Sequence, residues 1–245
     1  MYEPRSYRHW IRDKDLVSFN VVVKETDLYV RARRNLKRKA LKAVLKYRSS
    51  LEKYIDRNPA FLIALKPFPV GEDAPHIVKE MARASEQIGI GPMAAVAGAI
   101  AEYVGRDLLA FSPEVIVENG GDIFLKVSQG RLVGLYAGKS PFTGKIALQI
   151  EPEETPLGIC TSSGTVGHSF SSGKADAVIV LSPSAPLADA AATAIGNLVE
   201  DVGDIPRGIE FAQGIEGLRG AVIIKEDKIG LWGEVKISTL SSPVQ

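Results

Sequence analysis

Along the sequence, a region with helical periodicity precedes a region with strand patterns. This order constrains the fold more than any other feature of the chain. Between about residues 35 and 105, apolar residues recur at three- or four-residue steps, the spacing of one buried helix face. From Glu114 onward, short apolar runs are separated by turn residues, which predicts antiparallel strands. Because helices and strands are segregated rather than alternating, we expect an α+β fold of mainly antiparallel sheets packed with helices.

The predicted elements follow the chain in a simple order. A hairpin at 18–32, turning at 25–27, precedes helices at about 35–56, 76–88 and 92–105. Strands are then predicted at 114–119, 122–127 and 131–137, the last two joined as neighbours by a turn at 128–130. A helix at 186–199 should be capped by Ser184.

The length of 245 residues fits a single domain, 1–245. Within it we distinguish an N-terminal hairpin and long basic helix, residues 1–70, from a motif-bearing region, residues 71–245. Cys160 is the only cysteine, so no internal disulfide forms, which favours a reducing compartment. The longest apolar stretch, Met93–Ala101, is far shorter than the ~20 residues of a membrane span. We therefore expect a soluble, cytoplasmic protein without a membrane partner.

Charge is unevenly spread along the chain. Residues 1–58 carry a net charge of +9 and the remainder −8. The eight cations from Arg33 to Arg48 have no acidic residue among them. A solvated helix face or an anion-binding surface explains this run. The absence of an aromatic-interleaved or base-reading motif argues against nucleic acid.

The first of three polar motifs lies between two predicted strands. It consists of Asn119, Gly120, Gly121 and Asp122. Paired glycines permit backbone torsions closed to other residues and leave their amides uncovered. Exposed amides bind an anionic group or the polar edge of a ring. A plain hairpin turn is the alternative interpretation.

The second motif gathers hydroxyls, glycines, a thiol and an imidazole within residues 160–169. We do not expect so polar a segment to form a core strand. The phosphate ligands that it offers are Thr161, Ser162, Ser163 and Gly164. His168 is the best candidate for a catalytic acid or base, because imidazole titrates near neutral pH. A Ser/Thr/Gly loop without a ligand is the alternative.

The third motif pairs Asp189 with Thr193 on a predicted helix. Residues i and i+4 share one helix face, with Cβ atoms about 5–6 Å apart. A carboxylate and a hydroxyl so placed can share one hard cation such as Mg²⁺. Alternatively, Asp189 is favoured by its position near the helix N-terminus, and the Thr193 hydroxyl forms a hydrogen bond with the backbone of its own helix.

Taken together and in this order, the motifs resemble those of the ApbE-like flavin transferases. The match consists of NGGD at 119–122, TSSG at 161–164, His168, and ADAAATA at 188–194, and the resemblance covers about the last 160 residues. It implies an α+β fold with two intimately associated subdomains, FAD and Mg²⁺ as ligands, and transfer of FMN to a Thr hydroxyl of a target protein. Asp189 and Thr193 would be the Mg²⁺ ligands, and the first two motifs would contact the flavin dinucleotide.

Two departures indicate a shorter branch of that superfamily. The Lys-Gly-x-x-x-Asp helix motif is represented by residues 97–102 without the Lys, and the His-x-x-Asp-Pro-x-Thr-Gly segment is reduced to residues 168–173. The resemblance therefore predicts an ApbE-like protein that binds a flavin nucleotide, FAD or FMN, or another phosphate-bearing ligand, with Mg²⁺. It leaves FMN transferase activity open.

Two other functions stay open. The short branch resembles proteins associated with sulfide-dependent homocysteine formation, and a Cys160 thiolate beside the ligand loop would carry sulfur as a catalytic residue. A small buried residue at a strand end is the alternative interpretation of Cys160. The second of these functions is that of a non-catalytic module. Its basic helix would dock an acidic protein partner or nucleic acid. The sequence leaves the oligomeric state open, including a homo-oligomer.

Overall fold

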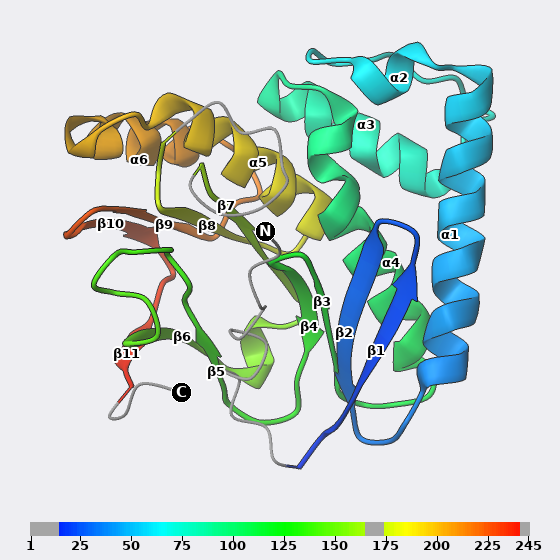
Figure 1. Ribbon diagram of the computed structural model, residues 1–245, viewed down its shortest axis with the longest axis horizontal. Helices are drawn as coiled ribbons and strands as arrows, with labels where there is room; N and C mark the ends of the chain where they lie inside the picture. The colour runs from blue at the N-terminus through cyan, green and yellow to red at the C-terminus, as the bar shows by residue number, and fades with distance from the viewer. Residues whose placement is uncertain (1–14, 165–173, 241–245) are drawn as a thin grey trace.

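The computed structural model describes residues 15–164 and 174–240, which form three layers (Figure 1). A layer of helices covers one face of an eight-stranded sheet, and a three-stranded sheet covers part of the other face. Both sheets are antiparallel throughout. The predicted α+β fold class of mainly antiparallel sheets packed with helices is therefore confirmed.

The large sheet has the strand order β1-β2-β3-β4-β7-β8-β9-β10. Its strands are β1 (Val17–Val23), β2 (Thr26–Ala32), β3 (Val115–Asn119), β4 (Asp122–Lys126), β7 (Leu157–Ser162), β8 (Ala177–Ser182), β9 (Gly220–Lys225) and β10 (Lys228–Gly233). The small sheet consists of β5 (Arg131–Gly134), β6 (Ile146–Ile150) and β11 (Ile237–Thr239), with β6 in the middle.

The helices segregate to one side of the large sheet. They are α1 (Lys37–Arg57), α2 (Ala60–Ile63), α3 (His76–Ile88), α4 (Val96–Leu109), α5 (Ala185–Leu198) and α6 (Ile205–Gln213), with short 3-10 turns η2 (Pro92–Ala95), η3 (Pro152–Glu154) and η4 (Val202–Asp204). The predicted cap of α5 is present, because the Ser184 hydroxyl accepts a hydrogen bond from the amide of Leu187 at 3.4 Å.

The large sheet buries apolar side chains on both faces. Side chains alternate along each strand, so Val117 and Phe124 face the helices while Ile116 and Leu125 face the small sheet. Because both faces are buried, the sequences of the central strands are nearly continuous runs of apolar residues. On the helix-facing side of β3, β4 and β7 lie Asn119, Asp122 and Ser162 of the first two polar motifs.

One predicted hairpin is wrong. The strands predicted at 122–127 and 131–137 correspond to β4 and β5, which belong to different sheets. Both edges of β4 are already paired, with β3 and with β7. β5 therefore has no free edge beside β4, and it pairs with β6 instead.

The turn of the first hairpin is one residue shorter than predicted and begins one residue earlier. Thr26 already pairs with Val23, so the turn consists of Lys24 and Glu25, with Lys24 at a φ of 52°. β2 then pairs with β3, which joins the N-terminal hairpin to the same sheet as the motifs. The division into residues 1–70 and 71–245 and the two-subdomain description stay predictions.

Among the helices of the described ranges, none is by itself both long and apolar enough to cross a membrane. The segments His76–Ile88 and Pro92–Leu109 meet the length and composition criteria only when taken as a pair, and they are bent by 109°.

Candidate functional site

The three motifs meet where α4 and α5 cross the large sheet. Asn119 on β3 and Asp122 on β4 are in phase with the helix-facing residues Val117 and Phe124. Cys160 on β7 belongs to the same helix-facing core. α4 contacts β3 and β4, and α5 contacts β7 and β8. The first two motifs, whose residues Asp122 and Thr161 are 39 apart in sequence, are thereby brought under one pair of helices, and α5 carries the third motif.

Side chains of the first motif form hydrogen bonds with two neighbouring elements, α4 and β7. The side-chain amide of Asn119 donates a hydrogen bond to the carbonyl of Ala97 on α4 at 3.0 Å. The carboxylate of Asp122 accepts a hydrogen bond from the amide of Thr161 on β7 at 3.1 Å. Both end residues of the motif therefore build the frame of the site.

The glycines of this motif are required by the backbone, but only one amide is left uncovered. Gly120 and Gly121 have φ values of 68° and 111°, a region that other residues rarely adopt. The amide of Gly121 donates to the buried carboxylate of Glu118 at 2.9 Å, which corrects the expectation that both amides are uncovered. A Cβ at Gly120 would meet no atom within 4 Å, and one at Gly121 only Thr161 at 3.9 Å. None of the described residues fills the space above the turn.

The second motif begins inside a central strand, contrary to expectation. Residues 160–162 complete β7, between β4 and β8. Pairing with β8 on one side and the Asp122 carboxylate at the Thr161 amide on the other hold this backbone, so polar side chains are tolerated there. Thr161 and Ser163 are half-buried, and Gly164 donates its amide to the carbonyl of Ala175 at 3.0 Å. His168 lies outside the described residues.

Ser162 has an unusual environment for a hydroxyl. Its side chain is buried, and among the described residues its Oγ has no hydrogen-bond partner. A buried unpaired hydroxyl is costly, and such groups in native proteins call for an explanation such as a ligand. Among the predicted ligands, Ser162 is thus the one with a fully buried side-chain oxygen that lacks a partner in the described structure.

Cys160 is placed in surroundings that suppress its reactivity. The side chain is fully buried, and its Sγ donates to the carbonyl of Ala185 at 3.3 Å. Burial and the nearby negative charges of Asp122 and Asp189 raise the pKa of the thiol well above its ordinary value. These surroundings favour the neutral thiol and argue against the predicted role of Cys160 as a sulfur-carrying catalytic residue.

The third motif is part of a reciprocal clamp between α4 and α5. Asp189 on α5 accepts a hydrogen bond from the amide of Gly98 at 2.9 Å, in the first turn of α4. Glu102 on α4 in turn accepts from the amide of Ala185 at 2.7 Å, the first residue of α5. Each helix supplies a carboxylate to the unpaired amides at the start of the other. Sequence reasoning missed the role of Glu102, although residues 98–102 carry its Gly-x-x-x-Glu pattern.

Thr193 lies one turn after Asp189 and is half-buried. Both residues therefore share one face of α5, as the spacing predicts. The described residues contain no group of three or more His, Cys, Asp or Glu side chains arranged to hold a metal. A cation here would rely on hydroxyl, carbonyl, water or substrate oxygens in addition to carboxylates.

Two of the buried carboxyl groups at this site, Asp122 and Asp189, have raised pKa values. Burial raises the pKa of Asp122 to about 7, against the lowering effects of the Thr161 amide and the Cys160 thiol. Burial, and then the charge of Asp122, raise the pKa of Asp189 well above its usual range, against the hydrogen bonds from Gly98 and Ala97. Within residues 15–164 and 174–240, no Lys or Arg forms an ion pair with either carboxyl group. Among the described residues, Asp122 and Asp189 thus have no compensating cation, whereas Glu102 is paired with Arg106.

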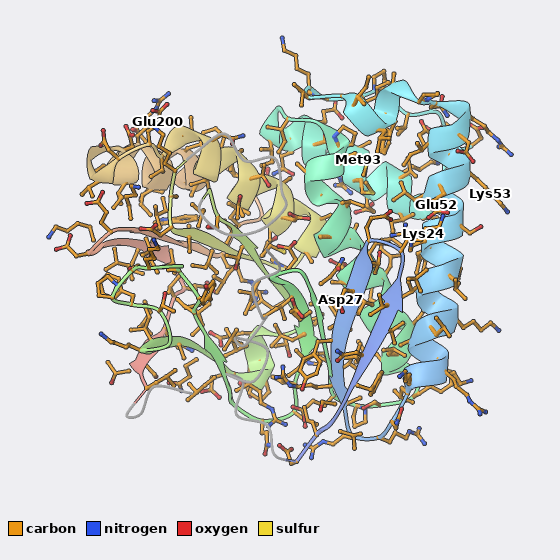
Figure 2. The ribbon with its side chains drawn as sticks, viewed as in Figure 1. Lys24, Asp27, Glu52, Lys53, Met93 and Glu200 are labelled. Carbon is orange, nitrogen blue, oxygen red and sulfur yellow. The ribbon has the colours of Figure 1, made fainter. Side chains whose placement is uncertain are left out.

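Two recesses lie away from the motifs, at the far end of the helix layer. One, of about 310 Å³, is lined by residues of α1 and the loop before α3, among them Tyr54, Arg57 and Lys53. Of these three residues, Figure 2 labels Lys53. The other, of about 600 Å³, lies between the loop 67–70 and α3. Neither contains a residue of the three motifs.

Comparison with known proteins agrees with this architecture. Residues 8–210 match the family model described as "AbpE bacteria". A UPF0280 protein of Methanopyrus kandleri is 46% identical over 227 residues, covering 89% of this chain and 91% of that protein. A UPF0280 protein of Methanocaldococcus jannaschii is 42% identical over 221 residues, covering 88% and 90%.

Solved structures share the fold at low sequence identity. The apo flavinyl transferase ApbE of Pseudomonas stutzeri superposes with a TM-score of 0.56 at 12% identity, covering 92% of this chain and 95% of that one. The flavin transferase ApbE of Vibrio cholerae gives a TM-score of 0.55 at 16% identity, covering 92% and 97%.

Proposed function

Because the chain belongs to the AbpE bacteria family and has the fold of the ApbE flavin transferases, we propose that it binds a flavin nucleotide together with Mg²⁺ where its three motifs meet. Flavin transfer to a protein is the reaction that this assignment favours. The observation that carries the proposal is the buried pair Asp122 and Asp189, which has no protein cation beside it in the described structure.

The residues present fit a magnesium ion. Mg²⁺ prefers oxygen ligands and is usually held by one or two carboxylates together with waters and substrate phosphates. Asp189 and Thr193 would hold the ion, and Asp122 would add negative charge nearby. When bound, Mg²⁺ stabilises negative charge on phosphoryl oxygens.

The protein's own groups would position the nucleotide. The open space above Gly120 and Gly121 lets a phosphate or ring edge approach the backbone closely. Ser162 offers an unpaired hydroxyl, and Thr161 is held in place through its amide by Asp122. Buried, preorganised donors of this kind bind anionic groups more strongly than exposed ones.

Variants of the proposed metal ligands test this function. We expect Asp189→Asn and Thr193→Val each to weaken Mg²⁺-dependent FAD binding by about tenfold or more, which is about 1.4 kcal/mol. Asparagine keeps an oxygen acceptor for the Gly98 amide, so Asp189→Asn should retain the fold. Binding is measured by the change in flavin fluorescence on titration.

The matched control is Glu210→Gln, which neutralises an exposed carboxylate on α6. It should bind FAD as the wild type does. If both ligand variants bind FAD with unchanged affinity and unchanged Mg²⁺ dependence, the proposed site is wrong.

A further inference from the structure

The eight cations from Arg33 to Arg48 lie on helix α1 and just before it, and the structure separates those with partners from those without. Figure 1 shows this helix along one edge of the molecule. Five of the eight cations between Arg33 and Arg48 have partners within the chain: Arg33 with Asp15 and Glu114, Arg34 with the Phe111 carbonyl, Lys39 over the Phe111 ring, Lys46 with Asp107, and Arg48 with Glu25 and Glu52. Lys37, Arg38 and Lys42 have no such partner among the described residues.

These three cations are exposed, and two of them stand where the helix itself disfavours them. Lys37 and Arg38 are the first two residues of α1, and its first turn has no acidic residue. The amides at a helix N-terminus carry partial positive charge, so cations there raise the local potential and reduce helix stability. Contacts within residues 15–164 and 174–240 therefore do not account for Lys37, Arg38 and Lys42.

Two exposed leucines share this outer surface. Leu41 is 41% exposed and Leu45 50% exposed, while Ala40 and Val44 face the core. Arg38, Leu41, Lys42 and Leu45 follow one another at i, i+3, i+4 and i+7, so they form a single stripe. With Lys37 beside it, we call this set the α1 stripe: Lys37, Arg38, Leu41, Lys42 and Leu45.

We propose that the α1 stripe docks a short acidic segment of another protein, one that presents carboxylates and apolar side chains on one face. The cations provide charge complementarity to carboxylates, and the two leucines provide an apolar contact between them. The docking is independent of flavin binding, because α1 carries none of the three motifs.

The size and composition of the stripe select this occupant. It extends about 12 Å along the helix and consists of five side chains, whereas a standard stable interface uses roughly 20–30 residues and 800 Å² per partner. A second copy of the chain as a stable dimer therefore fits it poorly. Binding of single-stranded nucleic acid relies on aromatic side chains that stack on bases, and the stripe has none. Two half-exposed leucines on a helix packed against the core also provide little surface for membrane insertion.

The test uses a fluorescently labelled synthetic peptide of about three helical turns, with Glu on one face and Leu at i, i+3 and i+7. We expect fluorescence anisotropy to show saturable binding that weakens as salt is raised from about 20 mM to about 150 mM. The double variant Arg38→Glu with Lys42→Glu should weaken binding about tenfold or more, and Leu41→Ser with Leu45→Ser about threefold.

Controls separate the stripe from general charge effects. The double variant Lys139→Glu with Lys145→Glu makes the same charge change on exposed residues elsewhere and should alter peptide affinity less than about twofold. The melting temperature of the Arg38→Glu, Lys42→Glu variant should not fall, because an acidic residue in the first turn favours the helix.

The proposal is overturned if the peptide does not bind, or if a leucine-free poly-Glu peptide binds equally well. It is also overturned if a single-stranded oligonucleotide or a vesicle containing anionic lipid binds more tightly through Arg38 and Lys42. Concentration-dependent self-association, measured by sedimentation and abolished by the same charge reversal, would instead assign the stripe to a second copy of the chain.

Discussion

Asp122 brings an ionisable group into the apolar layer between the large sheet and the helices. Its pKa is raised from 3.8 to about 7, chiefly by burial, with the charge of Glu118 adding to the effect. The Thr161 amide and the Cys160 thiol act in the opposite direction. The folded chain therefore holds a proton on Asp122 at pH values where the unfolded chain has already released it.

This difference predicts a pH dependence of stability. Below about pH 4 the carboxyl group is protonated in both states, and its contribution to folding is fully present. Between about pH 4 and about pH 7 only the folded state retains the proton, so the free energy of unfolding should fall as pH rises. Urea denaturation of the wild type and Asp122→Asn across this range measures it. The wild type should lose stability relative to the variant, whereas parallel curves would contradict the assignment.

At this scale, the sequence predicted which residues gather but not what most of them do. The order of the motifs indicated that Asn119, Asp122 and Asp189 share a site, and the structure brings them together. Sequence could not show that their side chains bind backbone groups of α4 and β7, because those partners are set by the packing of distant segments. Glu102 was missed for the same reason, since its partner amide lies 83 residues away.

The crossing of α4 and α5 is the element on which the site depends. Gly98 lies at the closest approach, where an added Cβ would stand 2.5 Å from the Ala185 carbonyl oxygen and 2.9 Å from the Asp189 Cβ. Neither neighbour is the flexible end of a long side chain, so the helices would have to separate. The hydrogen bond from Gly98 to Asp189 would be disturbed at the same time.

We therefore expect Gly98→Ala to destabilise the protein by about 1–3 kcal/mol, despite the higher helix propensity of alanine. Gly214→Ala is the matched control, because its Cβ would approach no atom closer than 3.5 Å. That substitution should change the free energy of unfolding by less than about 0.5 kcal/mol. Equal effects of the two substitutions in chemical denaturation would show that the crossing is not tightly packed.

Periodicity predicted individual elements well and their neighbours less well. The apolar spacing located α1 and α3 within a few residues, because each buries one continuous face. The hairpin expected between the strands at 122–127 and 131–137 failed, because a turn sequence does not reveal that both edges of β4 are occupied. Pairing between strands distant in sequence, as between β4 and β7, depends on the whole fold.

Across the whole molecule, a polar network fastens the two sheets to each other. Arg131 on β5 donates to Glu114, just before β3, at 2.6 Å, and both side chains are almost fully buried. Asp15 and Arg33 complete the network at its outer side. The guanidinium of Arg131 also lowers the pKa of Asp15 to about 2.

Removing Arg131 should loosen the contact between the sheets. Arg131→Ala leaves Glu114 buried with Arg33 as its remaining cationic partner, and we expect a loss of about 3 kcal/mol in the free energy of unfolding. Arg33→Ala removes a cation from the same carboxylate, but its side chain is 37% exposed, so a loss of about 1 kcal/mol is expected. Urea denaturation of both variants measures the order, and a larger effect at Arg33 would contradict this account.

The most direct test of the proposed site is isothermal titration of the wild-type protein with FAD, FMN and ADP, each with and without Mg²⁺. We predict that FAD binds in the presence of Mg²⁺ and at least about tenfold more weakly in its absence, because the buried Asp122 and Asp189 lack a protein cation in the described structure. Absence of binding in every combination, or FAD binding that Mg²⁺ does not change, would contradict the assignment of this site to a flavin nucleotide and its metal.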